Sequence, residues 1–445
     1  MINDINSQKD FGEFIYNLVN EFYSFYILKS SKPQENQWTI ISSIIMENNN
    51  NYKIICFSNG TKSLPNLNYK SREFQIFDCH TEILTLRCFK FFLLNALIFH
   101  LDKTNGKKIF NKTEFELFDS YKEFYDIFEF NEKSNKFKIK DSIKFHLYIS
   151  ENPCGECSNI EYRNNNGQDI KLMTGGKTLE ECLNLVDNNT INKFKETKQK
   201  IDYKFMTKSI RSDFKPNYLS YSLSCTDKIM LRNILGYQGK YLSFILEPIY
   251  INNIIINTSL TNTKENINSF KECLNYNLRN NTMDYQCKIP EIHFVNHKDD
   301  VYIFKGNKND KNSLSFSSYW YFPNNLKKVD PSNGIKTGGN IKDIDKIDFL
   351  RVKISNYDFC KNLFNILINF KNKKIFGKAI NKIEKYLLKD IKNIDFCDLI
   401  EILIDGNYAE KKFKILDENI NAKKFIGKKR NILKKIYLNE NTNYS

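Results

Sequence analysis

The short stretch Asp78 to Glu82, with the sequence Asp-Cys-His-Thr-Glu, constrains this chain more than any other. It opens an apolar run over residues 83–99 that predicts a long buried helix, so its histidine and glutamate stand at a helix N-terminus. Downstream, Asn152 to Cys157 supplies two cysteines after a predicted strand. One imidazole and two thiolates can hold zinc in a tetrahedron and leave the fourth position open. The two stretches therefore predict a zinc site built on His80 and Cys154.

Two cysteines compete for the second thiolate position. Cys157 completes a Pro-Cys-x-x-Cys pattern, in which both cysteines ligate zinc in many nucleobase deaminases. Cys225 lies in a Ser-Cys-x-Asp-Lys pattern that opens another predicted helix. The residues alone leave both possibilities open. A closed zinc site that only stabilises the fold is the alternative reading of the whole pattern, and it has no use for a carboxylate at the position of Glu82.

Composition limits the class of protein and the kind of partner. The 445 residues, of which 41% are hydrophobic and 14% aromatic, are enough to bury a large core. A net charge of +15 predicts a polyanionic partner such as nucleic acid, because lysines that neutralise phosphates release their counterions. The alternative is compositional, since lysine, asparagine, isoleucine and phenylalanine are all abundant.

The cysteines and the N-terminus predict an intracellular protein. The eleven cysteines are irregularly spaced, and the polar start Met1 to Asn6 lacks the features of a secretory signal. We therefore expect a reducing compartment, the cytoplasm or the nucleus. The most apolar run, Phe89 to Phe99, is interrupted by Lys90 and is too short to span a bilayer, so no membrane partner is expected. No pattern indicates an obligate protein partner.

The other patterns predict alternating helices and strands without a flexible linker between them. Helical spacing predicts an amphipathic helix over residues 10–28, and two alternating runs predict a β-hairpin over 38–57. Residues 102–142, which mix charges with aromatics, predict a surface insertion. Further predictions are a strand over 143–149 that leads to Cys154, a strand pair over 242–256, and helical patterns from about residue 260 to the basic cluster 428–435.

Five ordered motifs resemble those of the adenosine deaminases that edit messenger and transfer RNA, and the resemblance spans about residues 36–430. Five motifs in one order are far more specific than any single motif. They are His80-Thr81-Glu82 with Arg87, Pro153-Cys154-Gly155, Ser224-Cys225-Thr226-Asp227-Lys228-Ile229, Gly236-Tyr237-Gln238-Gly239 and Glu247-Pro248-Ile249-Tyr250.

This resemblance implies the fold and the organisation of the chain. The expected fold class is α/β, with a cytidine-deaminase-like three-layer α/β/α core and a helical C-terminal extension. One editing domain is expected over residues 1–445. Its parts would be an N-terminal helix (1–35), a zinc deaminase core (36–260) and a mostly helical extension (261–445).

The resemblance also implies the reaction, a zinc-dependent hydrolysis that converts adenosine to inosine in RNA. The tRNA branch is favoured because only about 35 residues precede the first matching strand, and because Thr174 to Lys177 resembles its Thr-Gly-Ala-Lys segment. The expected substrate is then the adenosine 3′ of the anticodon, position 37, in alanine tRNA. The alternatives are an editor of messenger or double-stranded RNA and an inactive tRNA-binding relative. Retention of Glu82 argues against the inactive relative.

Residue roles follow from the same resemblance. Glu82 is expected to be the catalytic proton carrier, and His80, Cys154 and Cys225 are expected to ligate zinc, which favours Cys225 over Cys157. Thr61 and Lys62 match a Gly-Thr-Lys turn that contacts the flipped nucleotide in the family.

The family also buries inositol hexakisphosphate, which requires pairing cations. The chain departs from the family pattern here, because Leu86 replaces an arginine and Leu231-Arg232 replaces Arg-Trp, and Thr81 replaces an alanine beside the zinc ligand. The matching positions are Arg87, Lys228, Lys336, Tyr408, Lys412 and Lys423.

A second histidine pair, His293 and His297, has the spacing of metal ligands. The acidic residue of a His-Glu-x-x-His helix is missing between them. We therefore predict two surface histidines on a strand or loop.

Overall fold

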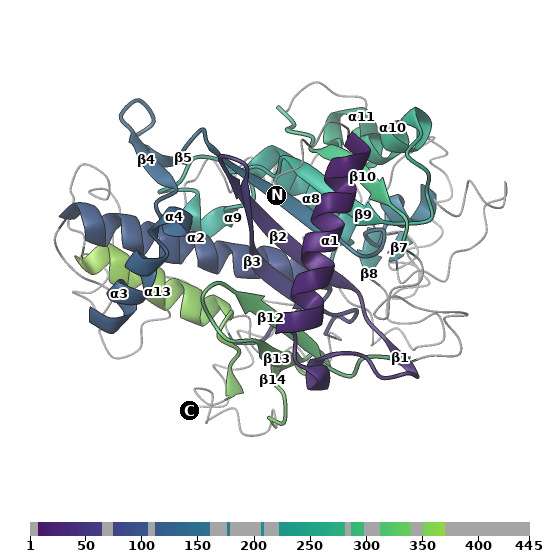
Figure 1. Cartoon of the computed structure of the whole chain (residues 1–445), viewed down its shortest axis with the longest axis horizontal. Helices are drawn as coiled ribbons and strands as arrows, with labels where there is room; N and C mark the ends of the chain where they lie inside the picture. The colour runs from purple at the N-terminus through teal and green to yellow at the C-terminus, as the bar shows by residue number, and fades with distance from the viewer. Residues whose placement is uncertain are drawn as a thin grey trace, which may run out of the picture.

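The computed structural model describes residues 8–64, 74–105, 112–160, 176–178, 206–208, 222–280, 286–297, 312–339 and 350–369. Their centre is an eight-stranded mixed sheet in the order β10-β9-β6-β2-β3-β12-β13-β14. Figure 1 shows helix α1 crossing one face of this sheet. The predicted α/β class is confirmed for this part of the chain.

The sheet combines segments from distant parts of the sequence. Its strands are β10 (Glu291–Val295), β9 (Asn253–Asn257), β6 (Ile143–Ile149), β2 (Ile41–Asn48), β3 (Asn51–Asn59), β12 (Ser317–Tyr321), β13 (Lys327–Asp330) and β14 (Ile335–Lys336). The pairs β10–β9 and β9–β6 are parallel, and the other pairs are antiparallel. Among the described residues, three short pairs lie outside it, β1 (Gln37–Trp38) with β11 (Asn312–Ser313), β4 (Phe128–Asn131) with β5 (Lys136–Ile139), and β7 (Gly176–Thr178) with β8 (Met206–Lys208).

Helices cover both faces of the sheet, as the alternation of side chains along each strand allows. Ile255 of β9 packs with Ile15 and Val19 of α1, whereas its neighbours Ile254 and Ile256 pack in the larger cluster that contains α2. The helices described are α1 (Gln8–Tyr26), η1 (Lys29–Ser31), α2 (Thr81–Asn105), α3 (Lys112–Ser120), α4 (Lys122–Tyr125), α8 (Cys225–Leu235), α9 (Gly239–Leu242), α10 (Lys264–Cys273), α11 (Tyr276–Asn280) and α13 (Asn356–Asn369).

Helix α2 is the long buried helix predicted after His80. Its length and hydropathy would allow it to cross a membrane, but 78% of its most apolar stretch is buried inside the protein. A helix that is apolar all round must be buried in this way or lie in lipid. Phe89, for example, is fully buried and meets Phe145 of β6 edge to face, with ring centroids 4.9 Å apart. Core packing therefore fixes the helix whose N-terminus follows His80.

The N-terminal helix, the hairpin β2–β3 and the strand over 143–149 confirm three predictions. The surface insertion predicted over 102–142 is wrong in part. This segment also forms a hairpin of β4 (Phe128–Asn131) and β5 (Lys136–Ile139), and it places Tyr125 and Phe137 in the main core. The aromatic residues between the charged ones form the buried face of the segment, and the charges alone had indicated an exposed one.

The strand pair predicted over 242–256 is also wrong. Only β9 forms there, because α9 and the loop after it occupy the first half of the segment. The sheet does not end at residue 260, since β10, β12, β13 and β14 all come from beyond it. Residues 370–445, the last part of the predicted helical extension, lie outside the described residues.

A chain of hydrogen bonds crosses the sheet beneath α1. The Nε2 atom of His146 donates to Glu47 Oε2, Asn253 Nδ2 donates to His146 Nδ1, and His293 Nε2 donates to Asn253 Oδ1, each at 2.9 Å. In this arrangement Nδ1 of His146 accepts a hydrogen bond and Nε2 donates one. The ring of Phe11 in α1 lies 5.1 and 5.3 Å from the two imidazoles. The polar side chains beneath α1 thus have hydrogen-bond partners where the helix packs on the sheet.

The prediction of two surface histidines is wrong for His293, which is buried in β10 under α1. His297 is half-buried, stacks on Tyr16 with centroids 3.7 Å apart, and places Nε2 2.7 Å from Glu13 Oε2. Both imidazoles therefore serve the packing of α1 on the sheet. No potential metal site among the described residues includes them.

Glu47 gives this interface a testable dependence on pH. The hydrogen bond with His146, helped by Lys144, lowers the pKa of Glu47 from 4.5 to about 2 despite burial. A depressed folded pKa contributes stability above pH 4.5, and this stability is lost as the pH falls toward 2. At 1.36 kcal/mol per pKa unit the contribution is about 3 kcal/mol. Glu47→Gln should therefore lower the free energy of unfolding at pH 7 by about this amount.

The measurement is urea unfolding at pH 7 and at pH 3, where the variant should lose less stability than the wild type. Glu13→Gln, which changes a half-exposed pair at the same helix, is the matched control and should change stability little. An unchanged pH dependence in Glu47→Gln would contradict the assigned role.

Candidate metal centre and catalytic site

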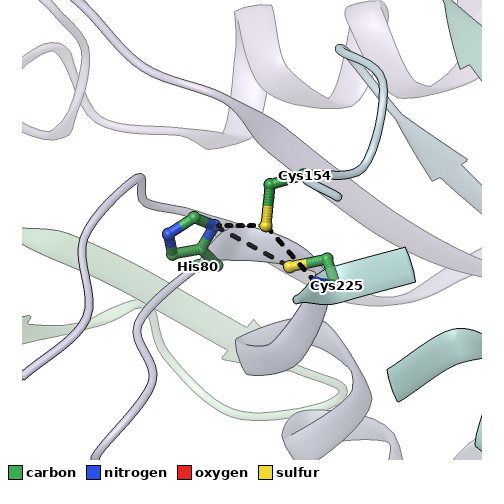
Figure 2. A group of neighbouring side chains, drawn as sticks. All are labelled: His80, Cys154 and Cys225. Carbon is green, nitrogen blue, oxygen red and sulfur yellow. Dashed lines mark hydrogen bonds between the residues drawn. The ribbon is translucent and has the colours of Figure 1, made fainter. Parts of the chain in front are cut away.

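His80, Cys154 and Cys225 meet at one point, although they are far apart in sequence (Figure 2). The Nδ1 atom of His80 lies 3.8 Å from the sulfur of Cys154 and 3.7 Å from that of Cys225. All three potential ligand atoms lie within 4.8 Å of one another. His80 immediately precedes α2, Cys154 follows β6 in a turn, and Cys225 is the first residue of α8.

The loop of Cys154 approaches the start of α8 closely because of Gly155. This residue has φ +109°, and a Cβ there would lie 2.5 Å from the Ser224 hydroxyl oxygen. Only glycine adopts that conformation without strain. Ser224 also caps α8, since its Oγ accepts a hydrogen bond from Asp227 N, and Thr226 N donates to Cys154 O at 3.1 Å. These local contacts hold the two thiols together.

The donor set fits zinc. Two sulfurs and one imidazole nitrogen are a common zinc environment, and three protein ligands leave a position open, as in catalytic sites. The hydrogen bond from the Cys225 thiol, together with the positive charges of Lys208 and His80, holds the pKa of Cys154 well below its ordinary value. A thiolate is the form that ligates metal. Cys157, the rival ligand, is fully buried in the main hydrophobic core and is not part of the group.

Glu82 is the second residue of α2 and lies close to this group, since charges at His80 and Cys154 act on its carboxyl. Its side chain is only 3% exposed, and its Oε2 atom has no hydrogen-bond partner among the described residues. Burial raises the pKa of the Glu82 carboxyl above its ordinary value. An unpartnered buried carboxylate oxygen is costly, and such groups are often functional. The Oε2 atom is therefore available to water or substrate.

Asp78 fixes the backbone that carries His80. Its Oδ1 accepts from His80 N at 3.0 Å, and both carboxylate oxygens accept from Lys208 Nζ at 2.8 Å. Lys228 Nζ and the Ser222 hydroxyl also donate to Oδ2. Although burial acts to raise it, the pKa of Asp78 is held well below its ordinary value by Lys208 and Lys228. The carboxylate therefore stays charged.

The predicted substrate residues Thr61 and Lys62 lie beside the same backbone. Lys62 O accepts a hydrogen bond from Cys79 N at 3.1 Å, and Gly60 O accepts from Thr81 N at 3.0 Å. Thr61 is half-buried and Lys62 is exposed. The loop that carries them is thus hydrogen-bonded to the residues before and after His80.

The residues expected to hold inositol hexakisphosphate are only partly described. Arg87 is half-buried and its Nη1 donates to Ile354 O at 3.1 Å and Asn356 Oδ1 at 2.9 Å. Lys228 pairs with Asp78, and Lys336 is exposed on β14. The other three, Tyr408, Lys412 and Lys423, lie outside the described residues.

Sequence reasoning missed two groups of charged residues. Lys208, almost fully buried against Asp78, stands in a polar segment where nothing distinguishes it from other lysines. Lys90 was seen only as an interruption of an apolar run. The charges of Arg87, Arg232 and Lys240 repel the Lys90 ammonium, so these four cationic side chains lie close together. The only signal for Lys90 was a charge on an otherwise apolar helix.

Comparison with known proteins gives matches to editing deaminases. The chain is 27% identical over 216 residues to the double-stranded RNA-specific editase B2 of Rattus norvegicus. This aligned stretch covers 46% of this chain and 24% of that protein. It is 25% identical over 228 residues to the tRNA-specific adenosine deaminase 1 of Schizosaccharomyces pombe, covering 49% of each. The protein of that name from Saccharomyces cerevisiae is 24% identical over 247 residues, covering 52% of this chain and 54% of that protein.

The matched stretch thus spans between a quarter and about half of these relatives' lengths. A broader match covers most of the chain, because residues 56–389 fit the description "Adenosine-deaminase (editase) domain". That range includes His80, Glu82, Cys154 and Cys225. The chain belongs to the adenosine-deaminase (editase) domain family.

Proposed function

We propose that this protein is a zinc-dependent hydrolase that converts adenosine to inosine in RNA, with tRNA as its substrate. The observation that carries the proposal is the meeting of His80, Cys154 and Cys225 beside the carboxyl of Glu82, whose Oε2 has no hydrogen-bond partner among the described residues. A zinc site that only stabilises the fold would not need this carboxylate. Nor would an inactive RNA-binding relative.

The donor set would hold zinc through His80 Nδ1 and the two sulfurs. When bound, zinc supplies a Lewis acid that lowers the pKa of water toward neutrality. Glu82 takes the proton from the attacking water, delivers it to N1 of adenine and assists the departure of ammonia from C6. Adenosine and water thereby give inosine and ammonia. A carboxyl with a raised pKa suits a role in which it first accepts and then donates a proton.

Lys208 and Lys228 act on the site through Asp78. Because Asp78 accepts from His80 N, its position orients the backbone of the imidazole ligand. Its two cations keep the carboxylate ionised inside the protein. We class all three as positioning residues.

The target adenine must leave its stack to reach a buried carboxylate. Thr61 and Lys62, on the loop hydrogen-bonded to Cys79 and Thr81, would contact this flipped nucleotide. The adenosine 3′ of the anticodon in alanine tRNA, position 37, is the proposed target. The thiols of Cys154 and Cys225 must remain reduced to bind zinc, so we place the protein in the cytoplasm or nucleus.

Double-stranded RNA is the second candidate substrate. It is favoured by the match to the rat editase, whose name states a specificity for double-stranded RNA. The two candidates differ in the RNA they require and not in the chemistry of the site, so one assay distinguishes them.

The test is inosine mapping by sequencing of a total tRNA pool and of a mixed-sequence RNA duplex after incubation with the zinc-loaded protein. We expect inosine in alanine tRNA at position 37. Glu82→Gln should lower the rate by at least about 10³-fold and keep its zinc, because general acid–base catalysis contributes about 10²–10⁴-fold. Inosine only in the duplex would favour the second candidate. Full activity of Glu82→Gln would refute the mechanism.

The identity of the third ligand can be tested by metal analysis of two matched variants. Cys225→Ser should lose most of its zinc, because a neutral hydroxyl replaces a thiolate. Cys157→Ser should keep one zinc per chain, since its side chain lies in the core. Zinc loss in Cys157→Ser alone would reverse the assignment.

We also propose that inositol hexakisphosphate binds among the cations beside α2. Burial, followed by the charges of Arg87, Arg232 and Lys240, holds the pKa of Lys90 well below its ordinary value. A bound polyanion would offset this repulsion. Lys90 stands one helical turn after Leu86, and Arg232 follows Leu231, so cations lie near both positions where the family's arginines are replaced.

Lys90→Met should therefore bind inositol hexakisphosphate at least about tenfold more weakly, because one charged contact is worth about 1.4 kcal/mol or more. Without the ligand, the variant should be at least as stable as the wild type, because it removes a repelled charge. Thermal unfolding and bound phosphate measure the two effects. Lys361→Met, at an exposed position of α13, is the control. A less stable ligand-free Lys90→Met would contradict the proposal.

A further inference from the structure

The last turn of α1 exposes apolar side chains where an amphipathic helix normally carries polar ones. Phe25 is 79% exposed, Tyr26 71% and Leu28 66%. Among the described residues, the other large hydrophobic side chains with such exposure are Leu117 and Leu278, at 44% and 49%. Single exposed apolar residues are ordinary, but a contiguous group indicates a binding surface. We call Phe25, Tyr26 and Leu28 the aromatic patch.

The aromatic patch rests on a rigid base. The ring of Tyr26 stacks on Phe22, with centroids 5.2 Å apart and an angle of 20° between the planes. Phe22 in turn packs against Phe57 of β3 and Trp320 of β12. One side of the Tyr26 ring is therefore supported while most of the side chain stays in solvent. A fixed aromatic face binds another flat ring at little cost in conformational entropy.

Lysines surround the aromatic patch. Lys29 is exposed and follows Leu28 directly. Lys32 Nζ donates to Ser24 O at 2.9 Å, and Lys328 Nζ donates to Ser30 O at 2.8 Å. Lys327, its neighbour on β13, is exposed as well. Glu21 and Glu35 lie in the same segment as Lys29 and Lys32, and Asp330 lies in the same strand as Lys327 and Lys328, so the four lysines outnumber these carboxylates by one.

The aromatic patch is joined to the candidate catalytic site by a short path. Ser31, at the end of η1, accepts a hydrogen bond from Asn59 Nδ2 at 3.1 Å. Asn59 precedes Gly60, whose carbonyl accepts from Thr81 N, the residue after His80. Figure 1 shows the C-terminal end of α1 near β12 and β13. Strand β12 pairs with the end of β3 at Asn59. The six residue-to-residue steps from Phe25 to Ser31 span at most about 22 Å.

We propose that the aromatic patch, bordered by Lys29 and Lys328, binds unpaired nucleotides of the substrate RNA that lie several positions away from the edited adenosine. Bases stack on exposed aromatic rings, and lysines neutralise the adjoining phosphates. At about 3.4 Å per nucleotide, roughly six nucleotides cover the stretch from Ser31 to Phe25. This inference rests on the proposed function, because it takes RNA to be the substrate.

A protein partner fits these observations less well. A stable protein interface buries about 800 Å² on each partner, and three side chains supply only part of that area. The size and charge of the surface suit a single RNA strand better.

The test compares binding of a fluorescein-labelled single-stranded RNA 12-mer and of the same sequence as a blunt duplex. Phe25→Ala should weaken binding of the single strand about tenfold and change duplex binding less than twofold, because one stacked base is worth about 1–3 kcal/mol. Phe25→Trp should bind as well as the wild type. Phe25→Leu should behave like Phe25→Ala, since it keeps the apolar character and loses the ring.

Leu278→Ala, at an exposed apolar position on α11, is the matched control and should bind like the wild type. Wild-type affinity in Phe25→Ala, or in Phe25→Leu, would overturn the stacking surface. A change in oligomeric state of Phe25→Ala by sedimentation, with RNA binding intact, would instead assign the patch to a protein contact and would also overturn it. Binding needs no turnover, so a wild type that makes no inosine would count against the proposed function alone.

Discussion

The geometry of the candidate site depends on the buried carboxylate of Asp78. It accepts hydrogen bonds from the backbone of His80 and from two lysines that arrive from distant segments, Lys208 on β8 and Lys228 on α8. A buried ion of this kind is tolerated only while its partners are present. The same interaction therefore ties α2, α8 and β8 together at the point where His80 and Cys225 meet.

Much of the site was predictable because its residues stand at element boundaries with strong local signals. His80 and Glu82 open the most apolar helix of the chain, and Cys154 follows a strand whose bounds, 143–149, the pattern predicted correctly. The Ser-Cys-x-Asp-Lys pattern is a helix cap in the structure, with Ser224 bonded to Asp227, which explains why Cys225 begins a helix and points at His80. The choice between Cys157 and Cys225, however, required the resemblance as well as the pattern.

The failures have a common physical cause, which is that burial by distant segments leaves no local trace. Lys208 is buried only because Asp78 lies across from it, 130 residues away in sequence. The sequence pattern predicts a surface position for His293, but Asn253 and Phe11 cover its imidazole. Tyr125 and Phe137 lie among charges in sequence, yet they fill the core beside α2. Periodicity describes one element at a time and cannot report such pairings.

The candidate ligands at positions 80, 154 and 225 are supplied by three separate segments, two of which follow strands of the central sheet. The set is complete only when the chain has folded across at least 145 residues, so contacts of long sequence separation must form before the donors converge. During synthesis on the ribosome, metal loading should therefore be a late event that waits for α8 to emerge from the exit tunnel. Earlier nascent chains would expose a histidine and a thiol that lack their common partner.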